Sequence, residues 1–307
     1  MFHLRPITPR DRSEVAELVC LSTNHWYQTR LGTKVFHAGP ESTAVFFDVY
    51  QALDPGCAVV AEHAATGLLV GSCFYHPRQT HVSLGIMNIH PNYFGRGIAK
   101  ALLQYILDYA DKHGHSSVRL VQSALNLDSF SLYTRAGFVP RRAFQDMLVG
   151  VPQEGLGRRF AGAEHVRPAK IEDVSAAAAL EREIAGISRE KDYRYFIDNR
   201  DGLWEMFVYD GPNGVEGFLA GLKHPGLPLV GPGVARTEEQ AAALLARVLD
   251  GFRGRTALCL VPADCPDLVQ DLYAIGAKNC ELHFSQVRGP FQPFRGVLMP
   301  TFLPETG

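Results

Sequence analysis

The chain carries the same sequence pattern twice, about half its length apart. The stretch "HLRPITPRDRSEVAELV" begins at position 3, and "HVRPAKIEDVSAAAALE" begins at position 165. Both read His-x-Arg-Pro, then an aspartate, then an apolar pattern typical of an amphipathic helix. Arg5 and Arg167 are 162 positions apart, and so are Asp11 and Asp173. A repeat this long predicts two related domains and not a solenoid, whose units run to about 20–50 residues.

A second match lies late in each half. The stretch "LYTRAGF" at 132–138 corresponds to "LYAIGAK" at 272–278, with Tyr133 and Tyr273 140 positions apart. Because this spacing is smaller than the first, the second copy is shorter in its middle. We therefore predict a first domain over residues 1–150, a glycine-rich linker over 151–163, and a second domain over 164–307.

Local patterns in the first half alternate between helix and strand. A broken helical region at 22–53 precedes "CAVVAEHAATGLLVGSCFYHP", which predicts a hairpin turning at 65–67, and a further strand follows at 81–89. Apolar residues then recur at helical spacing from Ile98 to Tyr109, and Gly114 ends the pattern. A strand at 116–123 and a short helix through Tyr133 complete the half. The fold class predicted for both tandem domains is α+β (α/β mixed sheet), mainly antiparallel and flanked by helices.

The overall composition argues against several function classes. The formal net charge is −2 without a block of like charges, which gives no indication of a nucleic-acid or anionic-membrane partner. The sequence shows neither a signal peptide nor a run of about 18 apolar residues. The six cysteines are scattered without a CxxC pair, which favours reduced thiols and no metal site. We expect a cytoplasmic monomer or homodimer with no nucleic-acid and no membrane partner.

Two glycines stand directly before the predicted helix that begins at Ile98, in "HPNYFGRGIAKALL" at 90–103. Glycine costs roughly 1 kcal/mol relative to alanine inside a helix, so a requirement of the turn or of a ligand must favour it here. The start of a helix has unpaired N–H groups and a partial positive charge, and a glycine-rich turn lets a phosphate approach the backbone. Arg96, between Gly95 and Gly97, adds a full positive charge. A tight strand-to-helix turn with nothing bound is the alternative explanation.

Three nucleotide-binding motifs can be compared with this loop. A P-loop ends in Gly-Lys-Ser/Thr, which "GRGIAKAL" lacks, and a dinucleotide fingerprint needs a glycine or alanine where Lys100 stands. Together with "ALNLDSFSLYTRAGF" at 124–138, the segment "IHPNYFGRGIAKALL" resembles the GNAT superfamily of acetyl-CoA-dependent N-acetyltransferases. The chain as a whole looks like a tandem GNAT-like repeat with a degenerate second copy.

The resemblance rests on two motifs. The loop pattern of that family, Gln/Arg-x-x-Gly-x-Gly/Ala, falls here on Phe94, Gly97 and Ala99. Phe94 departs from the family's glutamine or arginine, so we expect one phosphate contact to be weaker. The later motif has an asparagine, a small residue and a tyrosine before Gly-Phe. Its places are taken by Asn126, Ser129, Tyr133, Gly137 and Phe138.

The resemblance implies acetyl-CoA as the co-substrate and no metal. The pyrophosphate would lie in the glycine loop, and the pantetheine arm would pair with the backbone of Asn88 and Ile89. Tyr133 matches the family's proton donor to the departing thiolate, and packing between helix and sheet is its alternative role. The residues expected to bind the cofactor are Asn88, Ile89, Phe94, Gly95, Arg96, Gly97, Ile98, Ala99, Lys100, Asn126 and Ser129.

The sequence gives weaker indications of the base that takes the proton from the amine and of the site that binds the amine. Many relatives carry a glutamate on the central strands, but the strand at 81–89 contains no acidic residue. The candidate bases are Glu62, His76, His81, His25 and Asp48, and a chain of water molecules is an equal alternative. In the family the acceptor lies between the first helices and the last strands. The residues expected to contact it are Trp26, Tyr27, Phe47 and His76, and a core position is the alternative for at least two of the aromatic residues.

The second half keeps the predicted architecture but loses the glycine loop. Its counterpart, "VGPGVARTEEQAAALL" at 230–245, has no glycine at the helix start. Thr237 and Gln240 predict an ordinary capping box, and Glu238 and Glu239 put negative charge where phosphates would lie. We interpret this half as a degenerate domain that supports or completes the acceptor site.

The sequence thus predicts an N-acetyltransferase that moves an acetyl group from acetyl-CoA to a primary amine of a small molecule or peptide. A non-catalytic protein that binds or senses acyl-CoA is the alternative, which Phe94 and the missing central acid would favour.

Overall fold

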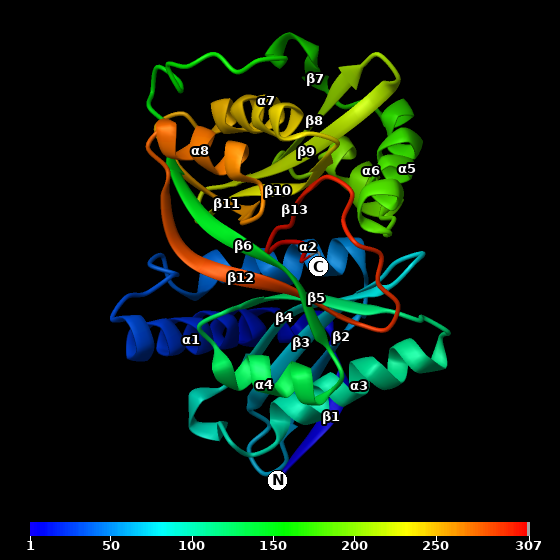
Figure 1. Ribbon diagram of the computed structural model, residues 1–307. Coiled ribbons are helices and arrows are strands. Elements are labelled where there is room, and N and C mark those ends of the chain that lie inside the picture. The colour runs from blue at the N-terminus through cyan, green and yellow to red at the C-terminus, as the bar shows by residue number, and fades with distance from the viewer. Residues whose placement is uncertain (306–307) are drawn as a thin grey trace. The chain divides into compact units, whose positions relative to one another are not determined.

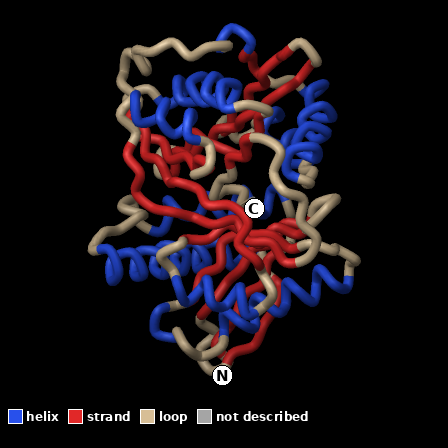
Figure 2. The backbone as a smooth tube through the Cα atoms, in the orientation of Figure 1, coloured by secondary structure: helices blue, strands red, loops and turns tan. Residues whose placement is uncertain are grey.

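The computed structural model describes residues 1–305 and divides into two compact units. Unit 1 comprises Met1–Pro77, His81–Val118 and Phe302–Glu305, and unit 2 comprises Arg78–Thr80 and Arg119–Thr301. Figure 1 labels the elements of both units, and Figure 2 separates helices, strands and loops by colour. These units are defined by which residues pack together, and their bounds differ from those of the repeat. The division into domains at residues 1–150 and 164–307 stays a prediction. No helix within residues 1–305 is long and apolar enough to cross a bilayer.

Unit 1 contains antiparallel strands in the order β1-β2-β3-β4. The strands are β1 (Phe2–Pro6), β2 (Ala58–His63), β3 (Leu69–Pro77) and β4 (Val82–Ile89). The helices are α1 (Arg12–Leu31), α2 (Ala44–Leu53) and α3 (Ile98–Lys112). The predicted hairpin at 65–67, the broken helical region and the helix before Gly114 are therefore confirmed.

Helices cover both faces of the sheet of unit 1. The ring of Phe74 on β3 lies 4.7 Å from the ring of Tyr50 on α2. Gly71 lies three positions before Phe74 on the same strand and therefore faces the other side of the sheet. A Cβ at Gly71 would lie 2.7 Å from a methyl carbon of Ile98 on α3. Glycine at this position lets the first turn of α3 pack directly on β3. The loop that precedes α3 is thereby held against the end of the sheet.

Unit 2 contains a larger sheet, with strands in the order β5-β12-β6-β11-β10-β9-β8-β7 and β13 paired to β10. Strand β5 (Val118–Ser123) belongs to unit 2 except for Val118. The others are β6 (Val139–Gly150), β7 (Val166–Pro168), β8 (Trp204–Gly211), β9 (Gly214–His224), β10 (Leu227–Ala235), β11 (Thr256–Pro262), β12 (Lys278–Arg288) and β13 (Val297–Met299). Strands β10 and β11 are parallel, whereas β6 is antiparallel to β11 and to β12, which confirms a mixed, mainly antiparallel sheet.

Helices also cover both faces of the sheet of unit 2. Its helices are α4 (Leu127–Arg135), α5 (Val174–Ala185), α6 (Glu190–Asp198), α7 (Glu238–Leu249) and α8 (Pro266–Ala274). On β9, a Cβ at Gly217 would lie 2.8 Å from Leu244 of α7. The next residue, Phe218, points to the other face, where its ring lies 4.8 Å from that of Tyr193 on α6.

Strands β6 and β12, which follow the corresponding helices α4 and α8 of the two repeat halves, are exchanged within unit 2. Strand β6 ends the first half of the sequence and lies between β12 and β11. Strand β12 comes from the second half and lies between β5 and β6. Asp146 on β6 pairs with Glu281 on β12 and with Leu260 on β11. The exchange therefore brings side chains from both halves of the sequence together on one sheet.

The repeated His-x-Arg-Pro pattern forms the same ion pair in each unit. The Nη1 of Arg5 donates to Oδ2 of Asp11 at 2.8 Å, and the Nη1 of Arg167 donates to Oδ2 of Asp173 at 2.7 Å. Hydrogen bonds from the guanidinium groups hold the pKa of both aspartates below its usual range. This identical geometry supports the interpretation of the two segments as copies of one ancestral element.

Candidate cofactor and active site

The predicted glycine loop joins β4 to α3 in unit 1. It contains the short 3-10 helix η3 (Pro91–Tyr93), followed by Gly95 and Gly97 with φ values of 74° and 80°. Both values lie in the left-handed region, which side chains other than that of glycine rarely adopt. A Cβ at either position would meet no atom within 4 Å. The backbone conformation, and not crowding by the chain itself, therefore requires glycine here.

The start of α3 offers unpaired hydrogen-bond donors. The first bond of the helix runs from the N–H of Ala101 to the carbonyl of Gly97 at 3.0 Å, and within residues 1–305 the amides of 98–100 donate no backbone bond. The guanidinium of Arg96 is exposed and lies 5.0 Å from the centre of the Tyr93 ring, which is a cation–π distance. Together, the free amides, the helix dipole and the cation make a site that suits a phosphate group.

Phe94 marks the departure from the expected loop pattern. Its amide donates to the carbonyl of Pro91 at 3.3 Å, so this N–H is already engaged. Its ring is 47% exposed and lies 6.0 Å from the ring of His25 on α1. At this position the loop thus presents an aromatic ring instead of a hydrogen-bonding side chain.

Asn88 and Ile89 end β4 immediately before the loop, where they pair with Ser72 and Gly71 of β3. The side chain of Asn88 is 5% exposed and donates from Nδ2 to the hydroxyl of Thr23 on α1 at 3.3 Å. Its Oδ1 has no hydrogen-bond partner among residues 1–305. The strand end therefore carries a buried polar acceptor next to the predicted path of the pantetheine arm.

The other predicted residues lie in unit 2, at the start of and along α4. Asn126 is the N-cap of this helix, and its Oδ1 accepts from the N–H of Ser129 at 3.1 Å. Tyr133 is 6% exposed, and its ring lies 5.8 Å from that of Phe138 across the turn at Gly137, where φ is 88°. The structure thus brings Asn126, Ser129 and Tyr133 together on one short helix, whereas the glycine loop belongs to unit 1.

The four predicted acceptor residues differ in exposure. Trp26 and Tyr27 are half-buried on α1, with their rings 4.9 Å apart. Phe47 on α2 is buried in the core of unit 1. His76 on β3 is 1% exposed, and its Nδ1 lies 2.5 Å from Oδ2 of Asp54. The partly exposed pair is therefore the better placed to meet a ligand.

Four of the five predicted candidate bases contact another side chain, and the fifth, His25, is exposed. Glu62 and Asp48 pair with arginines at 2.6 and 2.7 Å, respectively. His81 is fully buried, with its Nε2 3.0 Å from the hydroxyl of Ser83, and His25 is exposed. With His76, these residues are spread over α1, α2, β2, β3 and the residue before β4 in unit 1.

The corresponding helix start in unit 2 is already occupied. The hydroxyl of Thr237 accepts from the N–H of Gln240 and the Thr237 N–H donates to Gln240 Oε1, both at 3.3 Å, which confirms the predicted capping box. The carboxylate of Glu238 accepts from the N–H of Leu268 at 2.8 Å, near the start of α8. The amide of Gln240, the third in α7, is thus used within the protein, whereas the corresponding amide at the start of α3 has no backbone partner within residues 1–305.

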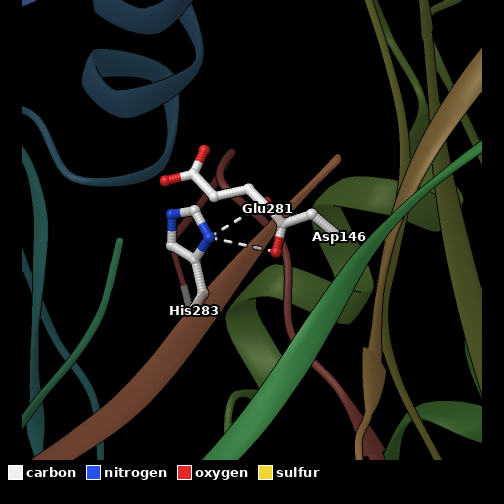
Figure 3. A group of neighbouring side chains, drawn as sticks. All are labelled: Asp146, Glu281 and His283. Carbon is white, nitrogen blue, oxygen red and sulfur yellow. Dashed lines mark hydrogen bonds and ion pairs between the residues drawn. The ribbon is translucent and has the colours of Figure 1, made fainter. Parts of the chain in front are cut away.

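A polar cluster in unit 2 was not predicted from the sequence. It consists of Asp146 on β6 and of Glu281 and His283 on β12, all of them buried. Each offers one carboxylate oxygen or ring nitrogen, and these three atoms lie within 4.8 Å of one another. Figure 3 shows the Nδ1 of His283 directed at Asp146, with the Glu281 carboxylate beside the imidazole ring. Nδ1 lies 3.0 Å from Oδ1 and 2.9 Å from Oδ2 of Asp146. The only signal in the sequence was Glu-x-His on a strand, which places both side chains on one face.

Such a cluster has two chemical uses. Carboxylates and an imidazole at this spacing can take up a metal ion, or they can accept and hold a proton. The contact between Nδ1 and Asp146 already satisfies one ring nitrogen and one carboxylate, which is the arrangement of a hydrogen-bonded pair. The cluster is therefore a hydrogen-bonded network.

A comparison with protein families matches residues 22–138 to the acetyltransferase (GNAT) family. A comparison with curated proteins finds UPF0157 protein YqkA of Bacillus subtilis, which is 30% identical over 94 residues. That match covers 30% of this chain and 27% of the relative, so the chain spans about a quarter of the length of this curated protein.

Solved structures share the fold over nearly the whole chain. A Pyrococcus horikoshii protein provisionally assigned as an acetyltransferase is similar with a TM-score of 0.73 and 17% identity, over 97% of this chain and 94% of that one. A GCN5-related N-acetyltransferase from Sphaerobacter thermophilus gives 0.63 and 18%, over 96% and 98%. A tandem GNAT protein from the clavulanic acid biosynthesis pathway gives 0.61 and 14%, over 94% and 98%. These similarities show a tandem fold.

Proposed function

We propose, from the match of residues 22–138 to the acetyltransferase (GNAT) family, that this chain moves an acetyl group from acetyl-CoA to a primary amine of a small molecule or peptide. The observation that carries the proposal is the loop before α3. Its two left-handed glycines leave the amides of 98–100 without backbone partners, beside the exposed guanidinium of Arg96. These groups would bind the pyrophosphate of the cofactor.

The remaining cofactor contacts are proposed from the resemblance of the two sequence motifs to those of the family. The pantetheine arm would run along the end of β4, at Asn88 and Ile89, where the unpaired Oδ1 of Asn88 offers an acceptor. Asn126 and Ser129 would contribute from the start of α4. Since the amide of Phe94 is bonded to Pro91, Phe94 would contribute by packing alone.

The reaction requires a neutral amine and a protonated leaving group. The amine lone pair attacks the thioester carbonyl carbon, the C–S bond breaks, and the thiolate takes a proton from the hydroxyl of Tyr133. The nitrogen of the new amide then loses its extra proton, which restores the Tyr133 hydroxyl through solvent. Acid catalysis of this kind contributes about 10²–10⁴-fold in rate. A buried hydroxyl suits this role, because bulk water then does not compete for the thiolate.

Trp26 and Tyr27 are proposed to contact the acceptor amine, because both rings are partly exposed on α1. Phe47 and His76 would support this surface from the core of unit 1. The second half of the sequence would bind no cofactor, since the start of α7 is capped and carries two glutamates.

A second function, binding or sensing of acyl-CoA without turnover, is favoured by one observation. Phe94 replaces a hydrogen-bonding residue, and its amide is already engaged.

A thiol-release assay distinguishes the two functions. With acetyl-CoA and a panel of primary amines, we expect release of free CoA that depends on the amine and that matches the amount of acetylated product by mass spectrometry. Binding of acetyl-CoA with thiol release at background for every amine would instead favour the sensor.

A further inference from the structure

The glycine loop of unit 1 contains an aromatic side chain that the proposed cofactor contacts do not use. Tyr93 is the last residue of η3 and lies three positions before Arg96. Its ring is half-buried, and the ring centre lies 5.0 Å from the Cζ atom of Arg96. A guanidinium within about 6 Å of a ring centre is attracted by the electron-rich face of the ring. Tyr93 is therefore in direct contact with the arginine of the loop.

Two histidine rings contact the same tyrosine. The ring of His90, the N-cap of η3, lies 5.5 Å from that of Tyr93 at an interplanar angle of 88°. The ring of His63, the last residue of β2, also lies 5.5 Å from it, at 60°. Edge-to-face and tilted contacts at these distances favour one orientation of the central ring. Tyr93 is thus held between the end of β2 and the start of the loop.

Hydrogen bonds fix the backbone that carries this ring. The N–H of His90 donates to the carbonyl of Val70 on β3 at 3.0 Å, and the N–H of Tyr93 donates to the carbonyl of His90 at 2.9 Å. The Nδ1 of His90 accepts from the N–H of Asn92 at 3.2 Å. The ring beside Arg96 is therefore attached to the sheet of unit 1 by backbone bonds as well as by ring contacts.

The contact with the ring leaves the hydrogen-bond donors of Arg96 without an acceptor. Within residues 1–305, Arg96 makes no hydrogen bond and no ion pair. Arg12 of the same unit differs, because it donates to both carboxylate oxygens of Asp48. A guanidinium has five N–H donors in a fixed fork that matches the oxygens of a phosphate. Arg96 is thus held in place and keeps these donors for a ligand.

We infer that Tyr93 positions the guanidinium of Arg96 for the pyrophosphate of acetyl-CoA, and this role rests on the proposed function. A long, exposed side chain loses conformational freedom when it binds a ligand, and a side chain that is already held loses less. The ring of Tyr93 therefore lowers the entropic cost of the contact between Arg96 and phosphate. This orientation strengthens the loop at a point where Phe94 offers no hydrogen-bonding side chain.

Tyr93→Leu removes the ring and keeps an apolar side chain. By isothermal titration calorimetry on the full chain, we expect the Kd for acetyl-CoA to rise about fivefold, the upper end of the range for an exposed cation–π contact. Tyr93→Phe should rescue this loss, because the attraction comes from the ring. The hydroxyl of Tyr93 makes no hydrogen bond within residues 1–305. Circular dichroism checks that each variant is folded.

Arg96→Gln distinguishes positioning from simple packing of the loop. This substitution removes the charge and should itself raise the Kd about tenfold, as expected for a hydrogen bond between charged groups. In the Arg96→Gln background, adding Tyr93→Leu should change the Kd less than about twofold, because no cation is left to position. The ligand 3′-dephospho-acetyl-CoA keeps the pyrophosphate and lacks the other phosphate group. Tyr93→Leu should weaken its binding by the same factor.

Phe160→Leu is the matched control. The guanidinium of Arg158 in unit 2 lies 5.2 Å from the centre of the Phe160 ring, and it also pairs with the carboxylate of Asp271. The substitution thus removes a comparable ring from beneath an arginine that already has an acidic partner. The Kd for acetyl-CoA should stay at the wild-type value.

Three results would overturn this role. A wild-type Kd in folded Tyr93→Leu, or an equal loss with and without the charge of Arg96, would make Tyr93 a packing residue. An effect that disappears with 3′-dephospho-acetyl-CoA would assign Arg96 to the 3′-phosphate instead. All three leave the proposed function standing. A wild-type chain that does not bind acetyl-CoA would overturn the proposed function and this role together.

Discussion

Gly97→Glu is expected to abolish the binding of acetyl-CoA while the chain stays folded. Residue 97 has a φ of 80°, and a side chain there costs about 1–2 kcal/mol in backbone conformation. A Cβ at this position meets no atom within 4 Å, so the substitution creates no clash in the fold. The added carboxylate would lie beside the free amides of 98–100 and repel the pyrophosphate. Isothermal titration calorimetry measures the binding, and circular dichroism checks the fold.

Gly114→Glu is the matched control for this variant. Gly114 follows the other end of α3, has a φ of 74°, and also leaves open space around a Cβ. It should therefore suffer the same conformational cost and still bind acetyl-CoA as the wild type does. Wild-type affinity in a folded Gly97→Glu protein would remove the loop from the binding site.

Tyr133→Phe should lower kcat about 10²-fold, at the lower end of the range for general acids, with little change in the Kd for acetyl-CoA. The substitution removes only the hydroxyl, so the ring contact with Phe138 at 5.8 Å is kept. The measurement is the rate of thiol release at saturating acetyl-CoA.

The repeat offers a control at the equivalent position. Tyr273 is 42% exposed, and its hydroxyl donates to Oε1 of Gln145 at 2.9 Å. Tyr273→Phe should therefore leave kcat unchanged. Equal rates for wild type and Tyr133→Phe would assign Tyr133 to packing between helix and sheet.

Local signals predicted much of the fold. The helix after the glycine loop and the hairpin at 65–67 follow from short-range periodicity and turn residues. The paired arginines and aspartates of the repeat also form within a few residues, so Arg5 and Arg167 make the same contacts. Each of these features depends on sequence neighbours alone.

The exchange of β6 and β12 could not be predicted in this way. Both strands have ordinary alternating patterns, and neither pattern records which strand will lie beside it. Glu281 and His283 were missed for the same reason, because their partners Asp146 and Ser123 come from the other half of the sequence.

The burial of two candidate residues could not be predicted either, because it depends on contacts with residues distant in the sequence. Phe47 and His76 were expected near the acceptor, and both are buried in unit 1. His76 contacts Asp54, which lies 22 positions away. The glycine loop, in contrast, was predicted from adjacent residues alone, and the structure adds that Gly95 and Gly97 have left-handed φ values.

The number of acetyl-CoA molecules bound per chain tests most directly whether the first half alone holds the cofactor. The start of α3 has free amides and Arg96, whereas the start of α7 has a capping box and two glutamates. Each glutamate at about 5–8 Å would repel a phosphate by up to about 2–3 kcal/mol at an effective dielectric near 20, which exceeds the roughly 0.3–1 kcal/mol from a helix dipole. Calorimetric titration of the wild-type chain should give a stoichiometry near one, and Gly97→Glu should reduce it to zero. A value near two, or a value near one that persists in Gly97→Glu, would contradict this assignment.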